Sequence, residues 1–392
     1  MFKQIAAVTG MNLRNLPQRS GISLVIVIGI TVTVAVLVSV MAMSAGFQKT
    51  LNNTGRDDRA IVLRGGSNSE LGSSISRENA QTILDAPGVK RDADGKPIGS
   101  AEMVAVINLP LKATGTDANV TLRGVGTKTL QLRPEVKIVE GRMFEPAVRE
   151  LIAGRSATKQ FAGLELGTRI KIRDTEWTVV GFFETGGDAH ESELFGDIET
   201  VLSAFRRNLF QSITVMLDSP GAFDTFKDKI TTDPSLTVKV LREPEYYAQQ
   251  SQQLSKLLDF VAVWIGGIMA LGAVFGTLNT MYSAVSARQV EIATLRAIGF
   301  GALPVVISVF VESLALALIG GGIGAMLAWA FFNGNTVNTL GANFTQVVFS
   351  LTVTPELIAN GVIWSCIIGM IGGLFPAVRA ARQPIATALR GH

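Results

Sequence analysis

The chain is poor in the residues from which metal, redox and disulfide sites are built. Its 392 residues include one cysteine, Cys366, and two histidines, His190 and His392. A lone cysteine excludes a disulfide framework and a thiolate metal cluster. Two histidines, far apart in the sequence, give no support for a histidine-based metal site or a catalytic triad. The sequence therefore predicts no metal site and no catalytic residue in this chain.

Charge is also scarce, at 17% of residues against about 25% in an ordinary soluble domain. Residues 46–256 hold 27 of the 35 lysines and arginines and 28 of the 32 aspartates and glutamates. The two flanks together therefore hold 8 basic and 4 acidic residues. The sequence thus predicts a soluble domain inserted into a membrane protein. The net charge of +3 arises in the flanks, so the inserted domain offers no basic surface for nucleic acid.

Four long apolar runs are candidates for membrane helices, which need about 20 such residues. We predict spans at 20–45, 257–283, 303–332 and 357–378, with a connection at 284–302 and a short loop at 333–356. The first run is too long for a signal peptide, and we expect it to remain as an anchor. Glu312 and Ser313 are polar residues inside the third span. Glu312 either pairs with a neighbouring helix or belongs to a polar pathway.

All lysines and arginines of the flanks fall on one side of this topology: Lys3, Arg14, Arg19, Arg288, Arg296, Arg379, Arg382 and Arg390. The positive-inside rule makes that side the cytoplasm. We therefore expect a bacterial inner (cell) membrane protein with both termini cytoplasmic and residues 46–256 periplasmic. Residues 1–19 are expected to form an amphipathic helix on membrane lipid, and 379–392 a cytoplasmic tail.

Glycine pairs four residues apart occur in three of the four spans, and such pairs allow close helix packing. The packing lies either within one subunit or across a dimer. Because four helices are few for a transporter, we expect a homodimer, with a related permease as the alternative partner. The pairs are Gly272/Gly276, Gly320/Gly324 and Gly369/Gly373.

The inserted domain alternates short strand patterns, such as 60–63, 169–172 and 177–183, with helical ones, such as 76–85 and 222–231. We predict a two-lobed α+β domain. Residues 245–258 are expected to run as a helical stalk into the second span, with 44–54 beside them. The acidic stretch 186–193 around His190 is interpreted as a solvated loop. No phosphate-binding loop and no nucleophile elbow occurs in these residues.

Two segments carry a more specific signal. Residues 279–324 and 372–390 resemble the signatures of the FtsX-like permease family, through a helix-and-turn pattern and a closing Pro-Ala-x-Arg-Ala-Ala-Arg motif. Segments 122–125, 139–144, 150–154 and 177–181 resemble the MacB-type periplasmic domain. Ala287 and Ala293 depart from the pattern, where the family often has Glu and Gly. The matching residues are Arg288, Glu291, Ile292, Leu295, Arg296, Ala297, Gly299, Glu312, Ser313, Gly320, Gly324, Pro376, Arg379 and Arg382.

The resemblance implies a permease subunit of an ABC-type export system. Such a subunit has four membrane helices and an α+β domain inserted between the first and the second. It implies that a separate ABC ATPase binds ATP and Mg²⁺, and that this chain passes the ATP-driven movement to its periplasmic domain. A peptide, antibiotic or siderophore is then expelled, with a periplasmic adaptor and an outer-membrane channel as further partners. The alternatives are a lipoprotein-releasing permease and a non-transporting activator of a cell-wall hydrolase. Residues implied to form the ATPase-coupling helix are Arg288, Glu291, Ile292, Leu295, Arg296 and Gly299, flanked by the tail residues Pro376, Arg379 and Arg382.

Overall fold

The computed structural model describes residues 2–14, 20–340, 346–382 and 384. The chain divides into two compact units. The helical unit comprises residues 1–45, 257–335 and 351–392, and the sheet unit comprises 46–256 and 336–350. Parts of the predicted amphipathic helix (15–19), of the 333–356 loop (341–345) and of the tail (383 and 385–392) lie outside the described residues.

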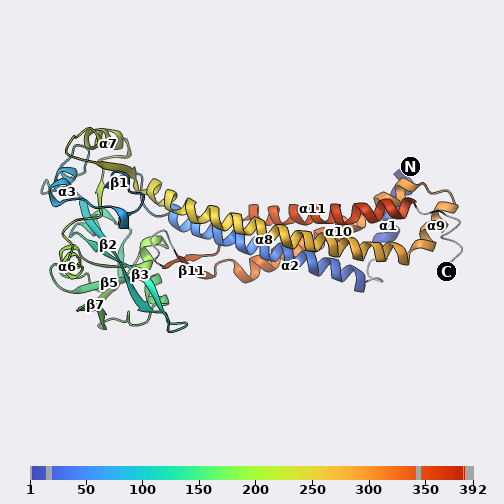
Figure 1. Ribbon diagram of the computed structural model, residues 1–392, viewed down its shortest axis with the longest axis horizontal. Helices are drawn as coiled ribbons and strands as arrows, with labels where there is room; N and C mark the ends of the chain where they lie inside the picture. The colour runs from blue at the N-terminus through green and yellow to red at the C-terminus, as the bar shows by residue number, and fades with distance from the viewer. Residues whose placement is uncertain (1, 15–19, 341–345, 383, 385–392) are drawn as a thin grey trace. The chain divides into compact units, whose positions relative to one another are not determined.

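The four predicted spans are confirmed as four helices long and apolar enough to cross a membrane. Two of them extend well beyond their apolar runs, since α2 ends at Asn52 and α8 begins at Glu243. The predicted stalk segments are thus continuations of these helices. Figure 1 shows the helices, whose bounds are α1 Phe2–Arg14, α2 Ser20–Asn52, α8 Glu243–Ala287, α9 Gln289–Ala297, α10 Ala302–Phe332 and α11 Pro355–Arg382.

Small residues set the close approach of helices in the helical unit. A Cβ on Gly324 would lie 2.6 Å from the Thr31 carbonyl oxygen of α2. A Cβ on Gly373 would lie 2.5 Å from the Ser313 Cβ of α10. Gly320 and Gly369 are equally crowded, by α2 and α10 respectively. Lipid gives no hydrophobic drive for helix association, so such contacts hold the bundle.

The glycine pair of α8 behaves differently. A Cβ on Gly272 or Gly276 would meet nothing within 4 Å. Of the three predicted pairs, those at 320/324 and 369/373 lie in tight contacts between helices of this chain. The remaining possibility for 272/276, packing across a dimer, stays a prediction.

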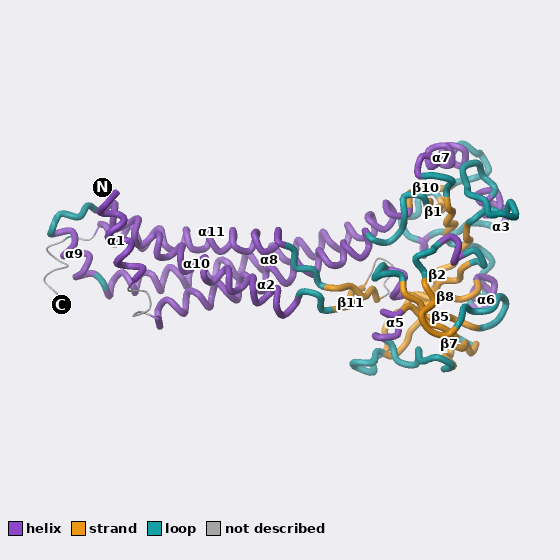
Figure 2. The backbone as a smooth tube through the Cα atoms, turned by 180° about the vertical axis from the view of Figure 1, so that it is seen from behind, coloured by secondary structure: helices purple, strands orange, loops and turns teal. Residues whose placement is uncertain are grey.

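The sheet unit is built on ten strands in the order β10-β1-β9-β2-β3-β8-β5-β7-β4, with β6 paired to β7. The long strand β2 joins two lobes, because residues 99–102 pair with β9 and residues 103–110 pair with β3. This agrees with the predicted two-lobed α+β fold (Figure 2). The strands are β1 Arg59–Arg64, β2 Gly99–Pro110, β3 Asp117–Val125, β4 Lys137–Gly141, β5 Glu150–Gly154, β6 Arg169–Ile172, β7 Thr175–Glu184, β8 Glu193–Asp197, β9 Ser212–Met216 and β10 Val238–Arg242.

Two of the short helices of the sheet unit begin at side-chain caps. The Ser76 hydroxyl accepts a hydrogen bond from the Asn79 amide at the start of α3, and the Asp197 carboxylate accepts one from the Thr200 amide at the start of α6. Such caps satisfy backbone donors that a helix start leaves open. The helices are α3 Arg77–Leu84, α4 Thr129–Leu132, α5 Arg155–Gln160, α6 Ile198–Ala204 and α7 Phe223–Thr231, with 3₁₀ turns η2 Glu70–Gly72, η3 Ala189–Ser192 and η4 Pro220–Ala222.

The predicted loop 333–356 is in part a hairpin. Strand β11 (Thr336–Leu340) pairs antiparallel with β12 (Gln346–Ser350), and both belong to the sheet unit. The Val348 amide donates to the Ser192 hydroxyl at 3.0 Å, and the rings of Phe349 and Phe47 meet edge to face at 5.5 Å. Six of these ten positions are β-branched or aromatic, a strand signal that the asparagine content obscured.

Candidate functional site

Helix α9 is the predicted coupling helix, and its ends are fixed locally. It closes with a Schellman motif, in which the Phe300 amide donates to the Leu295 carbonyl and the Gly299 amide donates to the Arg296 carbonyl. Gly299 has φ of +103°, a conformation that favours glycine. Gly301 is the N-cap residue of α10. The chain therefore turns sharply and holds α9 as a short rigid element.

A buried ion pair anchors the other end of α9. The Arg288 Nη2 atom lies 2.9 Å and 2.8 Å from the two carboxylate oxygens of Glu312, and Arg288 Nε donates to the Ala284 carbonyl. Both side chains of the pair are at most 5% exposed. The structure thus places Glu312 against Arg288 and gives the carboxylate a fixed charge partner. Arg288 acts within the chain, because its side chain is enclosed there.

The remaining predicted coupling residues divide between two faces of α9. Ile292 is buried against the bundle core, and Leu295 and Arg296 are half-buried. Glu291 and Gly299 are exposed. Two apolar side chains that the sequence prediction did not include share this open face, Val290 (54% exposed) and Ile298 (69% exposed). Exposed apolar residues flanking a rigid helix are typical of a protein contact surface.

Helix α1 and the end of α11 pack near this region. The Asn12 side chain donates to the Ser308 hydroxyl of α10 at 2.5 Å, and Val8 is buried. The Arg379 guanidinium lies 5.3 Å from the centre of the Tyr282 ring, a cation–π contact. Pro376 is buried within α11, which ends at Arg382. Ser313, the other predicted polar residue, donates to the Gly369 carbonyl at 2.8 Å.

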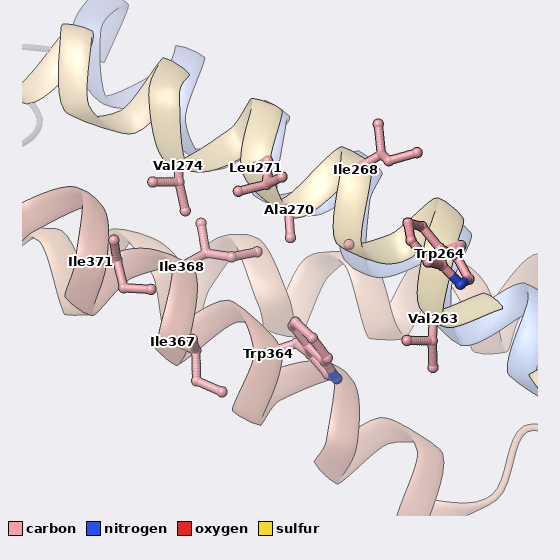
Figure 3. A pocket seen from close by; sticks show the side chains of 11 residues that line it. Val263, Trp264, Ile268, Ala270, Leu271, Val274, Trp364, Ile367, Ile368 and Ile371 are labelled. Carbon is pink, nitrogen blue, oxygen red and sulfur yellow. The ribbon is translucent and has the colours of Figure 1, made fainter. Parts of the chain in front are cut away.

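An apolar groove of about 470 Å³ lies between α8 and α11. Figure 3 shows Trp264, Leu271 and Val274 of α8 on one side and Trp364 and Ile368 of α11 on the other. Helix α8 is the least buried of the four spans over its apolar window. Its outward apolar side chains need a cover that these helices do not supply, which is lipid or another protein.

The sheet unit contains a buried ionic cluster that sequence reasoning missed. Arg123 contacts the carboxylates of Glu70, Glu102 and Glu193 at 2.7 to 2.9 Å. Arg133 pairs with Glu102 and Glu243, and Arg59 pairs with Glu243 and Glu135. Burial alone would raise the pKa of Glu102 and Glu193, but the arginines outweigh burial and lower both values. The members come from segments far apart in the sequence, and no local pattern marks them.

The segment around His190 corrects the solvated-loop prediction. His190 is 1% exposed and sits in η3, a buried 3₁₀ turn. Its Nδ1 atom lies 3.0 Å from the Glu193 carboxylate, and its Nε2 atom lies 3.2 Å from the Tyr247 hydroxyl. The acidic residues of this segment predicted a solvent-facing loop. In the structure their carboxylates instead pair with the His190 ring and with backbone amides. Among the described residues, no group of three or more potential ligands is placed to hold a metal ion.

Comparison with known proteins gives two family matches that together cover most of the chain. Residues 23–233 match the family described as MacB-like periplasmic core domain, and residues 263–385 match the FtsX-like permease C-terminal family. The first region contains the four segments that resemble the MacB-type periplasmic domain, and the second contains residues 279–324 and most of 372–390.

Individual relatives are similar at low identity. The macrolide export ATP-binding/permease protein MacB of Chlorobium phaeobacteroides is 26% identical over 93% of this chain and 57% of that protein. An uncharacterized ABC transporter permease of Methanocaldococcus jannaschii is 24% identical over 58% of each. The crystal structure of the periplasmic region of MacB from Actinobacillus actinomycetemcomitans aligns at 14% identity and TM-score 0.37, covering 52% of this chain and 92% of that one. The chain spans about half the length of the curated relatives it matches.

Proposed function

Because this chain belongs to the MacB-type family of FtsX-like permeases, as its motifs predict, we propose that it couples a separate ABC ATPase to the sheet unit. The partner binds ATP and Mg²⁺, and this multi-pass membrane protein transmits the resulting movement to release a substrate on the far side of the membrane. Export of a peptide, antibiotic or siderophore, with an adaptor and an outer-membrane channel, follows from the same proposal.

The observation that carries the proposal is the anchored helix α9. The Arg288–Glu312 pair and the Gly299 turn fix both ends of α9, so a push on the helix is passed to α8 and α10 without local yielding. Its open face presents Val290, Thr294 and Ile298, which at helical spacing form one contact surface. In this proposal the surface binds the ATPase, whereas Arg288 and Ile292 hold the helix in place. The side rich in lysine and arginine is the cytoplasm, where ATP is found.

Dimerisation belongs to the proposal on separate grounds. Gly272 and Gly276 present small surfaces on α8 that no described neighbour fills, and this helix leaves large apolar side chains exposed, among them Phe260, Ile268 and Phe275. A second copy of the chain packing along α8 would bury them.

The test uses the full chain, purified from its native membrane in lipid nanodiscs. Wild type is expected to retain an ATPase that hydrolyses ATP, and Val290→Glu or Ile298→Glu is expected to weaken that association about tenfold or more, since each charge would be forced into an apolar contact. Val139→Glu, at a comparably exposed valine in the sheet unit, is the matched control and should change nothing. Absence of any ATPase from the wild-type preparation would overturn the proposal. Retention of a peptidoglycan hydrolase in place of an adaptor and channel would favour the signalling alternative.

A further inference from the structure

We propose that the 3₁₀ turn η3 is a junction that couples the three chain segments leading from the sheet unit into the helical unit, with His190 as its central positioning residue. The functional meaning of this junction rests on the coupling role proposed above. Its existence as a mechanical link is a separate claim, carried by hydrogen bonds within the sheet unit.

Three residues of η3 each bond to a different segment. The Ala189 amide donates to the Thr54 hydroxyl at 3.0 Å, just beyond the end of α2. His190 Nε2 lies 3.2 Å from the Tyr247 hydroxyl, in the second turn of α8. Ser192 accepts from the Val348 amide at 3.0 Å, in the hairpin strand between α10 and α11. One four-residue turn therefore bonds to the segment after α2, to the start of α8 and to the hairpin strand β12.

Further contacts hold these three links in place. The Thr54 hydroxyl donates to the Thr50 carbonyl at 2.9 Å, which fixes it to the last turn of α2. The ring of Tyr247 meets His190 edge to face, with centroids 5.6 Å apart. Phe349, next to Val348, packs its ring against Phe47 of α2. A displacement of any one segment therefore acts on η3 through a short, ordered contact.

The turn itself has little freedom to absorb such a displacement. The Asp188 carboxylate accepts from the His190 amide at 2.9 Å, and the Glu191 carboxylate accepts from the Gly187 amide at 2.8 Å. His190 Nδ1 is held by Glu193, whose carboxylate also binds Arg123. Since a buried polar group that loses its partner is costly, the turn either moves as one body or breaks several bonds together. This is the property that a coupling element needs.

The tests cut one link and observe the other two. In the full chain in nanodiscs, Tyr247→Phe removes one hydroxyl and no ring volume. Hydrogen exchange at single-residue resolution then reports on the Ala189 and Val348 amides, which are the donors of the two uncut links. If η3 is a junction, both amides should exchange roughly threefold to tenfold faster, the range expected for one lost hydrogen bond.

Tyr246→Phe is the matched control. Tyr246 is the adjacent residue of α8 and is also buried, and its hydroxyl accepts a hydrogen bond from the Glu70 amide of η2 at 3.2 Å. This variant should leave the Ala189 and Val348 amides unchanged. Equal effects of both tyrosine variants, or an effect of Tyr247→Phe confined to α8, would overturn the junction.

A second arm separates this inference from the coupling proposal. In preparations that retain the ATPase, a non-hydrolysable ATP analogue is expected to change hydrogen exchange in β11 and β12 in wild type, and at least threefold less in His190→Ala. His190→Gln, which restores one of the two side-chain hydrogen bonds, should recover part of that response. A full response in His190→Ala would overturn the junction's role in transmission. Failure to retain an ATPase would instead count against the coupling proposal and leave the first test intact.

Discussion

The two units of this chain solve the problem of buried charge in opposite ways. In the helical unit, the described residues contain a single buried ion pair, Arg288–Glu312, set among apolar and small side chains. In the sheet unit, three buried arginines share several glutamates and connect η2, β1, β2, β3, β8 and the start of α8. The helical unit uses charge at one anchoring point, whereas the sheet unit uses it as a shared scaffold.

The difference follows from the medium that surrounds each unit, lipid for the helices and water for the sheet domain. Helices in lipid satisfy their backbone internally and approach through small residues, so an added charge is only a cost unless it fixes a specific element. A sheet domain in water already has its hydrophobic core. Its buried ionic cluster adds directional contacts among segments that apolar packing alone would let slide.

The largest effect is expected from breaking the cluster. Arg123→Met would leave Glu70, Glu102 and Glu193 buried with less than their full compensation, and we expect a loss of about 3–5 kcal/mol in the free energy of unfolding of the sheet unit. Urea unfolding of the full chain, followed by hydrogen exchange in β2 and β3, measures it. Arg77→Met is the matched control, because Arg77 pairs with Glu199 at the surface and should cost under about 1 kcal/mol. Similar losses for the two variants would contradict the scaffold interpretation.

A smaller effect is expected at the ion pair of the helical unit. Arg288→Met leaves the buried Glu312 carboxylate without its charge partner, so we expect a loss of about 2–3 kcal/mol in the free energy of unfolding. Glu312→Gln keeps a hydrogen-bond acceptor for Arg288, and the double variant Arg288→Met/Glu312→Gln should recover most of the loss. Thermal unfolding in detergent compares the three. A stable Glu312→Gln protein that has lost all ATP-driven activity would instead assign Glu312 to a polar pathway.

The sequence predicted the helical unit better than the sheet unit, for a physical reason. A membrane helix must be apolar over about 20 consecutive residues, so four spans can be read locally. The buried partners of Arg123 lie 21, 53 and 70 residues away, and no local rule says which acid meets which arginine. The same holds for His190, whose neighbours in sequence look solvent-facing and whose enclosing partner Tyr247 lies 57 residues further on.

The predicted coupling helix shows a finer limit of sequence reasoning. Family motifs predict residues 288–299 as one functional block, but a motif does not say which side of a helix is covered. The packed structure divides the block into Arg288 and Ile292, which are buried, and Val290 and Ile298, which are exposed.

Glycines of α10 and α8 differ in how closely a neighbouring helix approaches them. Gly324→Ala forces a Cβ against the Thr31 carbonyl of α2, a backbone atom that cannot turn aside, and we expect a loss of about 1–3 kcal/mol. Gly272→Ala meets no neighbour within 4 Å and should raise monomer stability slightly, by up to about 1 kcal/mol. Thermal unfolding in detergent measures both, and native mass spectrometry measures dimer content. If Gly272→Ala leaves dimer content unchanged, α8 packs across no dimer at this glycine.

The smallest expected effect concerns pH and the sheet unit alone. Burial would lower the pKa of His190, but the carboxylate of Glu193 outweighs burial and raises it above 6.5. A raised histidine pKa contributes stability that is fully present below the unfolded value and is lost as pH rises through the folded value. The Ala189 and Val348 amides, corrected for intrinsic exchange, should therefore lose protection as pH rises above about 6.5. The charged and titratable groups facing His190 are Glu193, Asp188, Arg133, Glu102 and Tyr247.

His190→Gln cannot titrate in this range and should give a flat profile, which separates His190 from its neighbours. Asp188 also has a raised pKa, because it is buried. Its contribution is likewise lost as pH rises, but the loss begins from its ordinary value of 3.8. Asp188→Asn should therefore leave the loss of protection above about pH 6.5 in place. If the loss of amide protection with rising pH persists in His190→Gln and disappears in Asp188→Asn, the titrating group is Asp188. His190 would then not be the central residue of the junction.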